Sequence, residues 1–189
     1  MRNILPVFIF LIASISNCSS DKSPLQQLEN KEPNSQLEFG TGNEYEIYSI
    51  VLNSFKRDYP PIFVLSDSTI FWDISNSIHY FKDNMPSLLD DTIDDYQNIN
   101  KESIQLKNIP DLEVECFLIP KNEAVNWKIK HPDAVALIHF SRVGFNAEKN
   151  QALVYFTDYF APLAGSGNLI LLEKNMEWVI VKTVMVWIS

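Results

Sequence analysis

The C-terminal third of the chain alternates between apolar runs and short polar breaks, and no other feature of the sequence restricts the fold as strongly. Four apolar runs occupy residues 135–145, 152–157, 169–174 and 178–188. The breaks between them lie at residues 146–150, 158–168 and 175–177, and the longest is predicted to be a loop. Because short connections between neighbouring strands require antiparallel pairing, the pattern predicts a four-strand meander.

Several of these runs are apolar on both faces. A strand with only one buried face alternates between apolar and polar residues, so a continuous apolar run indicates burial on both sides. The sequence therefore predicts a sheet that either curls around its core or is covered on both faces.

A helix is predicted at the start of the folded domain. Thr41 and Glu44 match a capping box, in which the hydroxyl and the carboxylate bind the free amides of the first turn. Apolar residues then recur at i, i+3, i+4 and i+7, namely at Tyr48, Val51, Leu52 and Phe55. The helix is expected to end near residue 57, since the prolines at 60 and 61 cannot continue it.

The middle of the chain predicts shorter elements. Residues 62–65 and 112–119 are apolar runs typical of strands, and residues 78–81 and 90–96 suit short helices. Cys116 shares one face of its strand with apolar residues, so it is interpreted as a small buried hydrophobic residue.

Together these elements predict a single α+β domain over residues 41–189. The N-terminal helix and the short helices are expected to pack on a curled antiparallel sheet that ends in the meander. The order of helix and meander is similar to cystatin-like and nuclear transport factor 2-like folds. This is an analogy of fold alone, and such folds host binding modules and enzymes alike.

The N-terminus has the features of an export signal followed by a lipid attachment site. Arg2 precedes an apolar run over residues 4–15 that is too short to span a membrane. Ile15-Ser16-Asn17-Cys18 resembles the lipobox of bacterial lipoproteins, which implies a signal peptide at residues 1–17 and lipid on Cys18.

The same resemblance implies a location in the cell envelope. Ser19, directly after the cysteine, implies sorting of the lipoprotein to the outer membrane. Residues 18–40 are polar with few large apolar side chains, a composition typical of a flexible tether. Once Cys18 carries lipid, Cys116 is the remaining thiol, so no intramolecular disulfide is expected.

The acidity of the chain argues against a nucleic-acid partner. The formal net charge is −9, and loss of Arg2 with the signal peptide takes it to −10. The longest basic cluster is the pair Lys56-Arg57, too short to neutralise a phosphate backbone. The expected partners are the membrane, through the lipid anchor, and a protein or small-molecule ligand.

Roughly the last 55 residues carry four short motifs. These are Ser141-Arg142-Val143-Gly144-Phe145-Asn146, Ala152-Leu153-Val154-Tyr155, Gly165-Ser166-Gly167 and the closing Trp187-Ile188-Ser189. The set resembles a group of uncharacterised bacterial envelope proteins. The resemblance brings no known activity with it.

His139 and Ser141 are predicted to share one strand face, and with Asp67 they offer a base, a nucleophile and an orienting acid. This is the basis of a hydrolase alternative, although the sequence has no Gly-x-Ser-x-Gly elbow. A hydrogen-bonded core or rim histidine is the preferred interpretation of His139. No histidine has the i, i+4 spacing of a zinc helix, so no metal and no cofactor is predicted.

Arg142 is predicted to lie among apolar neighbours, where an arginine needs a carboxylate partner. That partner is expected to be Asp67 or another carboxylate, unless Arg142 binds an anionic ligand. Gly165 and Gly167 are expected in a loop whose amides face a ligand. The acid cluster Asp90, Asp91, Asp94 and Asp95 lacks the ligand pattern of a calcium loop, and it is interpreted as a solvated helix end.

The sequence therefore predicts a lipid-anchored envelope protein that acts by binding. The ligand site is expected to involve Arg142, Asp67, Ser141, Gly165 and Gly167. Two alternatives stay open: a hydrolase that uses His139 and Ser141, and an inhibitor or immunity-type protein whose acidic surface binds a basic partner.

Overall fold

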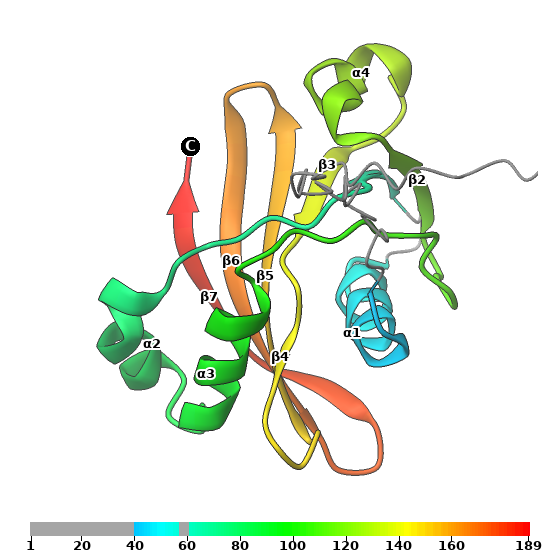
Figure 1. Cartoon of the computed structure of the whole chain (residues 1–189). Helices are drawn as coiled ribbons and strands as arrows, with labels where there is room; N and C mark the ends of the chain where they lie inside the picture. Colours follow the sequence, from blue (N-terminus) through cyan, green and yellow to red (C-terminus); the bar gives the residue numbers. More distant parts are fainter. Residues whose placement is uncertain (1–39, 57–60) are drawn as a thin grey trace, which may run out of the picture. The chain divides into compact units, whose positions relative to one another are not determined.

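A mixed sheet of seven strands forms the centre of the described structure and confirms the predicted α+β class (Figure 1). The computed structural model describes residues 40–56 and 61–189. The strands are β1 (Ile62–Ser66), β2 (Glu115–Ile119), β3 (Ala136–Phe140), β4 (Gly144–Phe145), β5 (Gln151–Ala161), β6 (Ala164–Lys174) and β7 (Trp178–Ile188). The helices are α1 (Gly42–Asn53), α2 (Ile78–Asn84), α3 (Asp90–Ile99) and α4 (Trp127–Lys130), with 3₁₀ turns η1 (Ser75–Ser77) and η2 (Lys121–Asn126).

The strand order is β2-β1-β3-β5-β6-β7, with β4 paired to β5. Strands β3, β5, β6 and β7 are antiparallel neighbours, which confirms the C-terminal meander. The prediction of a wholly antiparallel sheet is wrong, because β1 runs parallel to both β2 and β3. The connections 67–114 and 120–135 contain helices, so each is long enough to return the chain to the same end of the sheet.

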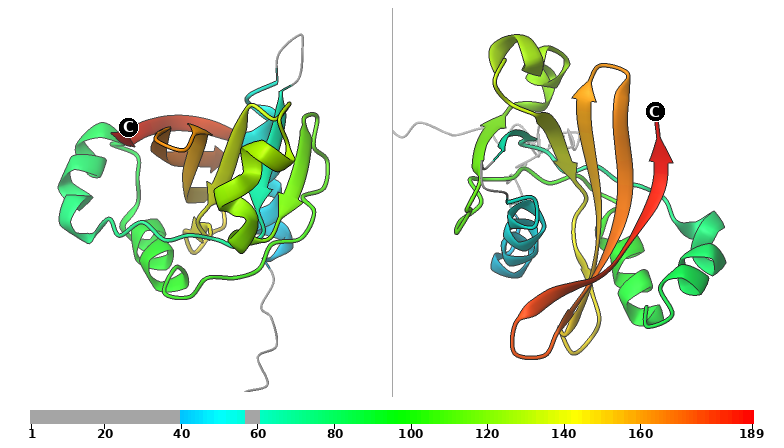
Figure 2. Two further views of the ribbon diagram at one scale, coloured as in Figure 1. Left: turned by 90° about the horizontal axis from the view of Figure 1, so that it is seen from above. Right: turned by 180° about the vertical axis from the view of Figure 1, so that it is seen from behind.

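The predicted loop over residues 158–168 is also wrong, because β5 and β6 form one long hairpin there (Figure 2). Their pairing continues to Ala161 and Ala164, so Pro162 and Leu163 make the turn. Asp158 interrupted the apolar run in the sequence. In the structure it stays in the strand because its carboxylate accepts a hydrogen bond from the backbone N–H of Ser166 (3.2 Å).

Gly165 and Gly167 therefore lie within β6 and not in a loop. A side chain at Gly167 would overlap the indole of Trp187 and the hydroxyl of Tyr155. Its absence leaves room for the hydrogen bond that Trp187 Nε1 donates to Tyr155 Oη (2.5 Å). The glycine at 167 thus permits the Trp187 side chain of β7 to lie close to the backbone of β6.

The capping box at the start of α1 is confirmed. The Thr41 N–H donates to the Glu44 carboxylate (2.8 Å), and the Glu44 N–H donates to the Thr41 hydroxyl (3.4 Å). The helix ends at Asn53, earlier than predicted. The Ser54 hydroxyl donates to the carbonyl of Val51 (2.6 Å), a side-chain bond that competes with continued helix at this point.

Helices cover both faces of the sheet, as one of the two predicted arrangements requires (Figure 1). On one face, α1 packs through its predicted apolar stripe on residues such as Ile138 and Phe156. On the other face, α2 and α3 pack on Tyr155 and Leu171, and Trp127 of α4 packs in a separate cluster nearer β1. The sheet stays open, and β2 and β7 are its edge strands.

Helix α3 approaches the short strand β4 closely. A Cβ added at Gly144 would lie 2.5 Å from the backbone of Tyr96 in α3. The acids of α3 face the same segment: the Asp95 carboxylate accepts from the Phe145 N–H (2.8 Å), and the Asp91 carboxylate accepts from the Ala147 N–H (3.0 Å). Asp90, Asp91 and Asp94 are exposed, as the interpretation of a solvated helix end predicts, and Asp95 is partly buried. Asp91 and Asp95 in addition bind the segment that begins with β4.

Cys116 lies in β2 and packs against the cluster that α1 forms with the sheet. It is only partly buried, less than its interpretation as a small buried hydrophobic residue predicts. Burial raises the pKa of its thiol to about 12. A thiol with so high a pKa is protonated and unreactive at neutral pH.

The signal peptide, the lipidated Cys18 and the tether are predictions that lie outside the described residues. Within residues 40–56 and 61–189, no helix is long and apolar enough to cross a membrane.

We expect Gly144→Ala to lower the free energy of unfolding by about 2–3 kcal/mol, because its Cβ would push α3 away from β4. Gly42→Ala is the matched control, since a Cβ there meets no atom within 4 Å and alanine favours the helix. Urea denaturation of the two variants measures the difference. Equal stabilities would contradict the close approach of α3.

Candidate functional site

Arg142 is paired with a carboxylate, as the sequence predicts. Of the acids left open, the partner is Glu44 of α1 and not Asp67. Arg142 Nε lies 3.2 Å from Glu44 Oε1, and the Arg142 side chain is 13% exposed against 1% for Glu44. The same Glu44 oxygen accepts from the backbone N–H of Val143 (3.3 Å). The guanidinium is therefore occupied in holding α1 on the sheet, and a role for it in anion binding has no support in this geometry.

Asp67 has a different place. Its Oδ1 accepts from the backbone N–H of Lys121 (2.9 Å) and from the Ser68 hydroxyl (3.0 Å), and its Oδ2 accepts from Gln105 (3.3 Å). These bonds join the end of β1 to the start of η2 and to the segment that returns from α3. The sequence could not separate Asp67 from Glu44 as the partner of Arg142, because both lie far from it in the chain.

His139 and Ser141 do not form a nucleophile and base pair. Ser141 is fully buried, and its hydroxyl donates to the Arg142 carbonyl (2.7 Å) and accepts from the Tyr155 N–H (2.8 Å). His139 is half-buried, and within the described residues its Nδ1 has no hydrogen-bond partner, so the expectation of a hydrogen-bonded core histidine is wrong. This arrangement gives the hydrolase alternative no accessible nucleophile.

The five residues of the expected ligand site do not converge. Gly165 pairs with Tyr159, which is opposite Leu137, and Gly167 pairs with Thr157, which is opposite His139, so both glycines are separated from β3 by β5. Ser141 and Arg142 follow the end of β3. Both glycines are paired with β5 as residues of β6, so their amides are not presented to a ligand by a loop.

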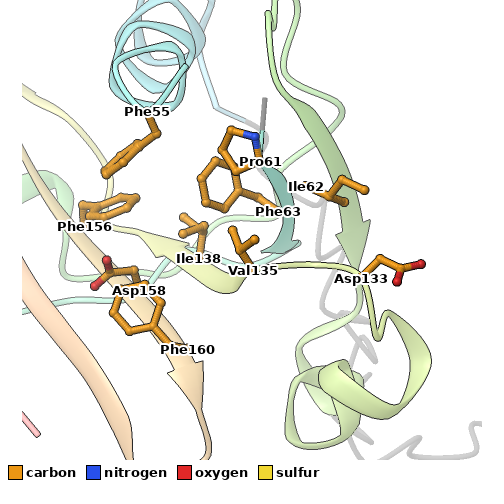
Figure 3. Close-up of a pocket in the computed structure, with 10 residues that line it drawn as sticks. All are labelled: Phe55, Pro61, Ile62, Phe63, Asp133, Val135, Ile138, Phe156, Asp158 and Phe160. Carbon is orange, nitrogen blue, oxygen red and sulfur yellow. The ribbon is translucent and has the colours of Figure 1, made fainter. Parts of the chain in front are cut away.

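An apolar hollow lies just beyond the C-terminal end of α1 (Figure 3). It has a volume of about 560 Å³, within the usual range for small-molecule sites. We name it the α1 groove. Its walls come from the segment after α1 and from β1, β3 and β5, and its aromatic side chains are Phe55, Phe63, Phe156 and Phe160.

Two carboxylates lie at opposite ends of the α1 groove, with apolar side chains between them (Figure 3). Asp158 is 9% exposed, and its Oδ1 is held by the backbone N–H and hydroxyl of Ser166. Within the described part of the chain, Asp158 Oδ2 has no such partner. Asp133 is exposed at the other end, and none of the described lining residues is Lys, Arg or His.

A smaller hollow continues the groove toward β7. Its volume is about 250 Å³, and it shares Phe55, Phe156 and Asp158 with the α1 groove. The two hollows lie side by side on the part of this sheet face that α1 does not cover. Their shared carboxylate is that of Asp158.

One local pattern in the sequence belongs to this site. Phe156, Asp158 and Phe160 alternate with Thr157 and Tyr159, which is the pattern of a strand with one distinct face. Assigning residues 158–168 to a loop concealed that face. The contributions of Phe55 and Phe63 depend on the packing of α1 and β1 beside β5, which no local pattern encodes.

No family model matches the chain, and neither a curated protein nor a solved structure matches it. Function is therefore argued from the site. Across residues 40–56 and 61–189, no group of three or more His, Cys, Asp or Glu side chains could hold a metal ion.

We expect Arg142→Met to lower the free energy of unfolding by about 3–5 kcal/mol, because it leaves the buried Glu44 carboxylate without its guanidinium partner. Lys82→Met is the control, since it breaks an ion pair with the exposed Asp90, and such pairs contribute less than about 1 kcal/mol. Thermal and urea unfolding compare the two. Similar small losses in both variants would show that the Glu44 pair does not hold α1.

Proposed function

We propose that this chain is a lipid-anchored cell-envelope protein whose domain is a non-catalytic binding module, with the α1 groove as its ligand site. The observation that carries the proposal is the groove itself, an apolar hollow of about 560 Å³ with a carboxylate at each end. Sites of this size with apolar walls and a few placed polar groups are typical of small-molecule binding.

The charge of the groove selects the ligand class. A buried carboxylate such as Asp158 favours a ligand that supplies hydrogen-bond donors and positive charge, since an anion there would be repelled at low dielectric. The phenylalanine walls favour a long apolar body. The ligand is therefore an amphiphile with an ammonium group.

A non-catalytic role is supported by the chemistry of the lining. Apart from Asp133 and Asp158, the described lining residues are Phe, Ile, Val and Pro, which offer neither a nucleophile nor an acid or base. The two carboxylates lie at opposite ends of the groove, so they do not act on one bond together (Figure 3).

Anchoring by lipid on Cys18, in the outer membrane, is part of the same proposal. Its support is the lipobox-like Ile15-Ser16-Asn17-Cys18 and the polar segment over residues 18–40. Such an anchor would keep the domain beside a bilayer, where amphiphilic ligands are concentrated.

We expect octylammonium to bind the α1 groove at least tenfold more tightly than octanoate, with 1-octanol between them, because the charged side chains that line the described groove are both carboxylates. Calorimetry on the chain from residue 18 with Cys18→Ser measures this without detergent. Phe160→Ala should weaken octylammonium and 1-octanol alike by about tenfold, through lost apolar burial.

Matched controls lie on the other face of the sheet. Phe71 is 46% exposed against 54% for Phe160, and Asp83 in α2 is exposed as Asp133 is. Phe71→Ala and Asp83→Asn should leave binding unchanged, whereas Asp133→Asn should weaken octylammonium and not 1-octanol. Equal binding of octylammonium and octanoate would refute the proposed ligand class.

We expect metabolic labelling with palmitate to mark the chain and Cys18→Ala to abolish both the label and membrane association. Cys116→Ala is the control, since its buried thiol should not affect the label. Full membrane association of an unlabelled Cys18→Ala form would show that the chain is held in another way.

A further inference from the structure

Another hollow, separate from the two described above, lies on the opposite face of the sheet from the α1 groove. We name it the His139 cleft; its volume is about 330 Å³, and Leu137, His139, Tyr159 and Trp127 are among its lining residues. Successive residues of a strand point to opposite faces, so Ile138 faces the groove while Leu137 and His139 face the cleft. The two sites are therefore separated by the sheet.

The cleft lies between η2, which contributes Ala124 and Val125, and the tip of the β5–β6 hairpin, which contributes Ala161 and Pro162. Figure 1 shows α4 and this hairpin tip at the same end of the sheet. The walls are apolar, and the ring of Tyr159 meets that of His139 edge to face at 5.9 Å.

Two buried polar atoms at this place have no hydrogen-bond partner among the described residues: His139 Nδ1 and Thr157 Oγ1. His139 and Thr157 are directly opposed across β3 and β5, and Thr157 is 1% exposed. Opposed side chains have Cβ atoms about 4.5–5.5 Å apart, so a rotamer adjustment brings the hydroxyl within reach of the ring nitrogen. An orphaned buried polar group is costly, which favours this bond when the site is filled.

The bond would fix the tautomer of His139. With Nδ1 accepting from Thr157, the proton lies on Nε2, the ring nitrogen left to face the cleft. Burial lowers the pKa of the His139 imidazole to about 4, and the positive charge of Lys121, in the first turn of η2, adds to that shift. His139 is thus a neutral N–H donor in the wall of an apolar cleft, and the ammonium of Lys121, which is not itself a lining residue, is near enough to act on it.

We propose that the His139 cleft binds a small carboxylate with an apolar body, whose carboxylate accepts from His139 Nε2–H and faces Lys121. The apolar body lies against Trp127 and Tyr159. Thr157 is a positioning residue, which acts through the tautomer of His139.

The test uses 4-methylbenzoate and its neutral isostere 4-methylbenzamide, titrated into the chain from residue 18 with Cys18→Ser. We expect the carboxylate to bind about tenfold more tightly than the amide, and Thr157→Val and Lys121→Met each to remove most of that preference, as loss of one charge-assisted contact predicts. Lys101 is an exposed residue just after α3. Lys101→Met makes the same change of charge as Lys121→Met and should leave the preference for the carboxylate intact.

A second readout separates binding from folding. Proton NMR follows the titration of His139, and saturation with 4-methylbenzoate should raise its pKa, since an adjacent anion favours the imidazolium, whereas the amide should not. Thr157→Val should be at least as stable as the parent, because it removes an orphaned hydroxyl. Phe160→Ala in the α1 groove should leave all of these results unchanged.

The proposal is overturned if carboxylate and amide bind equally, if His139 shows no shift with the carboxylate, or if Thr157→Val keeps the full preference. Because the ligand, the variants and the face of the sheet differ from those of the α1 groove, either site can fail without the other.

Discussion

The placement of α1 depends on one buried carboxylate. Glu44 closes the capping box with Thr41, pairs with Arg142 and accepts from the Val143 N–H. One side chain therefore satisfies the start of the helix and the chain that follows β3. Tyr48, one turn further along α1, donates to the Ser141 carbonyl (2.9 Å) and ties the helix to the same segment. A buried charge is tolerated here because each of its bonds is made.

This docking determines where the sheet stays open. The start of α1 is held beside the end of β3, and the helix has 12 residues, about 18 Å at 1.5 Å per residue. It ends before it covers the first part of β3 and the tip of β5. Phe55 follows the end of the helix and stacks on Phe156 at 5.4 Å, so it forms the boundary between packed core and open groove. The groove is thus a consequence of helix length and of where Glu44 anchors the first turn.

The two faces of the same strands offer different chemistry. Along β5, Asp158 and the flanking phenylalanines face the acidic groove, while Thr157 and Tyr159 face the side of the His139 cleft. A shift of register by one residue would exchange these sets, so both sites depend on the pairing of β5 with β3 and β6. The bond from Trp187 to Tyr155 over Gly167 supports that register from β7.

The sequence by itself determined the features that are encoded within a few residues: the capping box at Thr41, the apolar stripe of α1, the strand at Cys116 and the antiparallel meander. Each follows from periodicity or from a local hydrogen bond. The partner of Arg142, the parallel pairing of β1 with β3 and the groove beside Phe55 were decided only in three dimensions. The Arg142 pair alone joins residues 98 positions apart, and several acids satisfied the same local rules as Glu44. Only the packing of a helix on one particular part of the sheet selects among them.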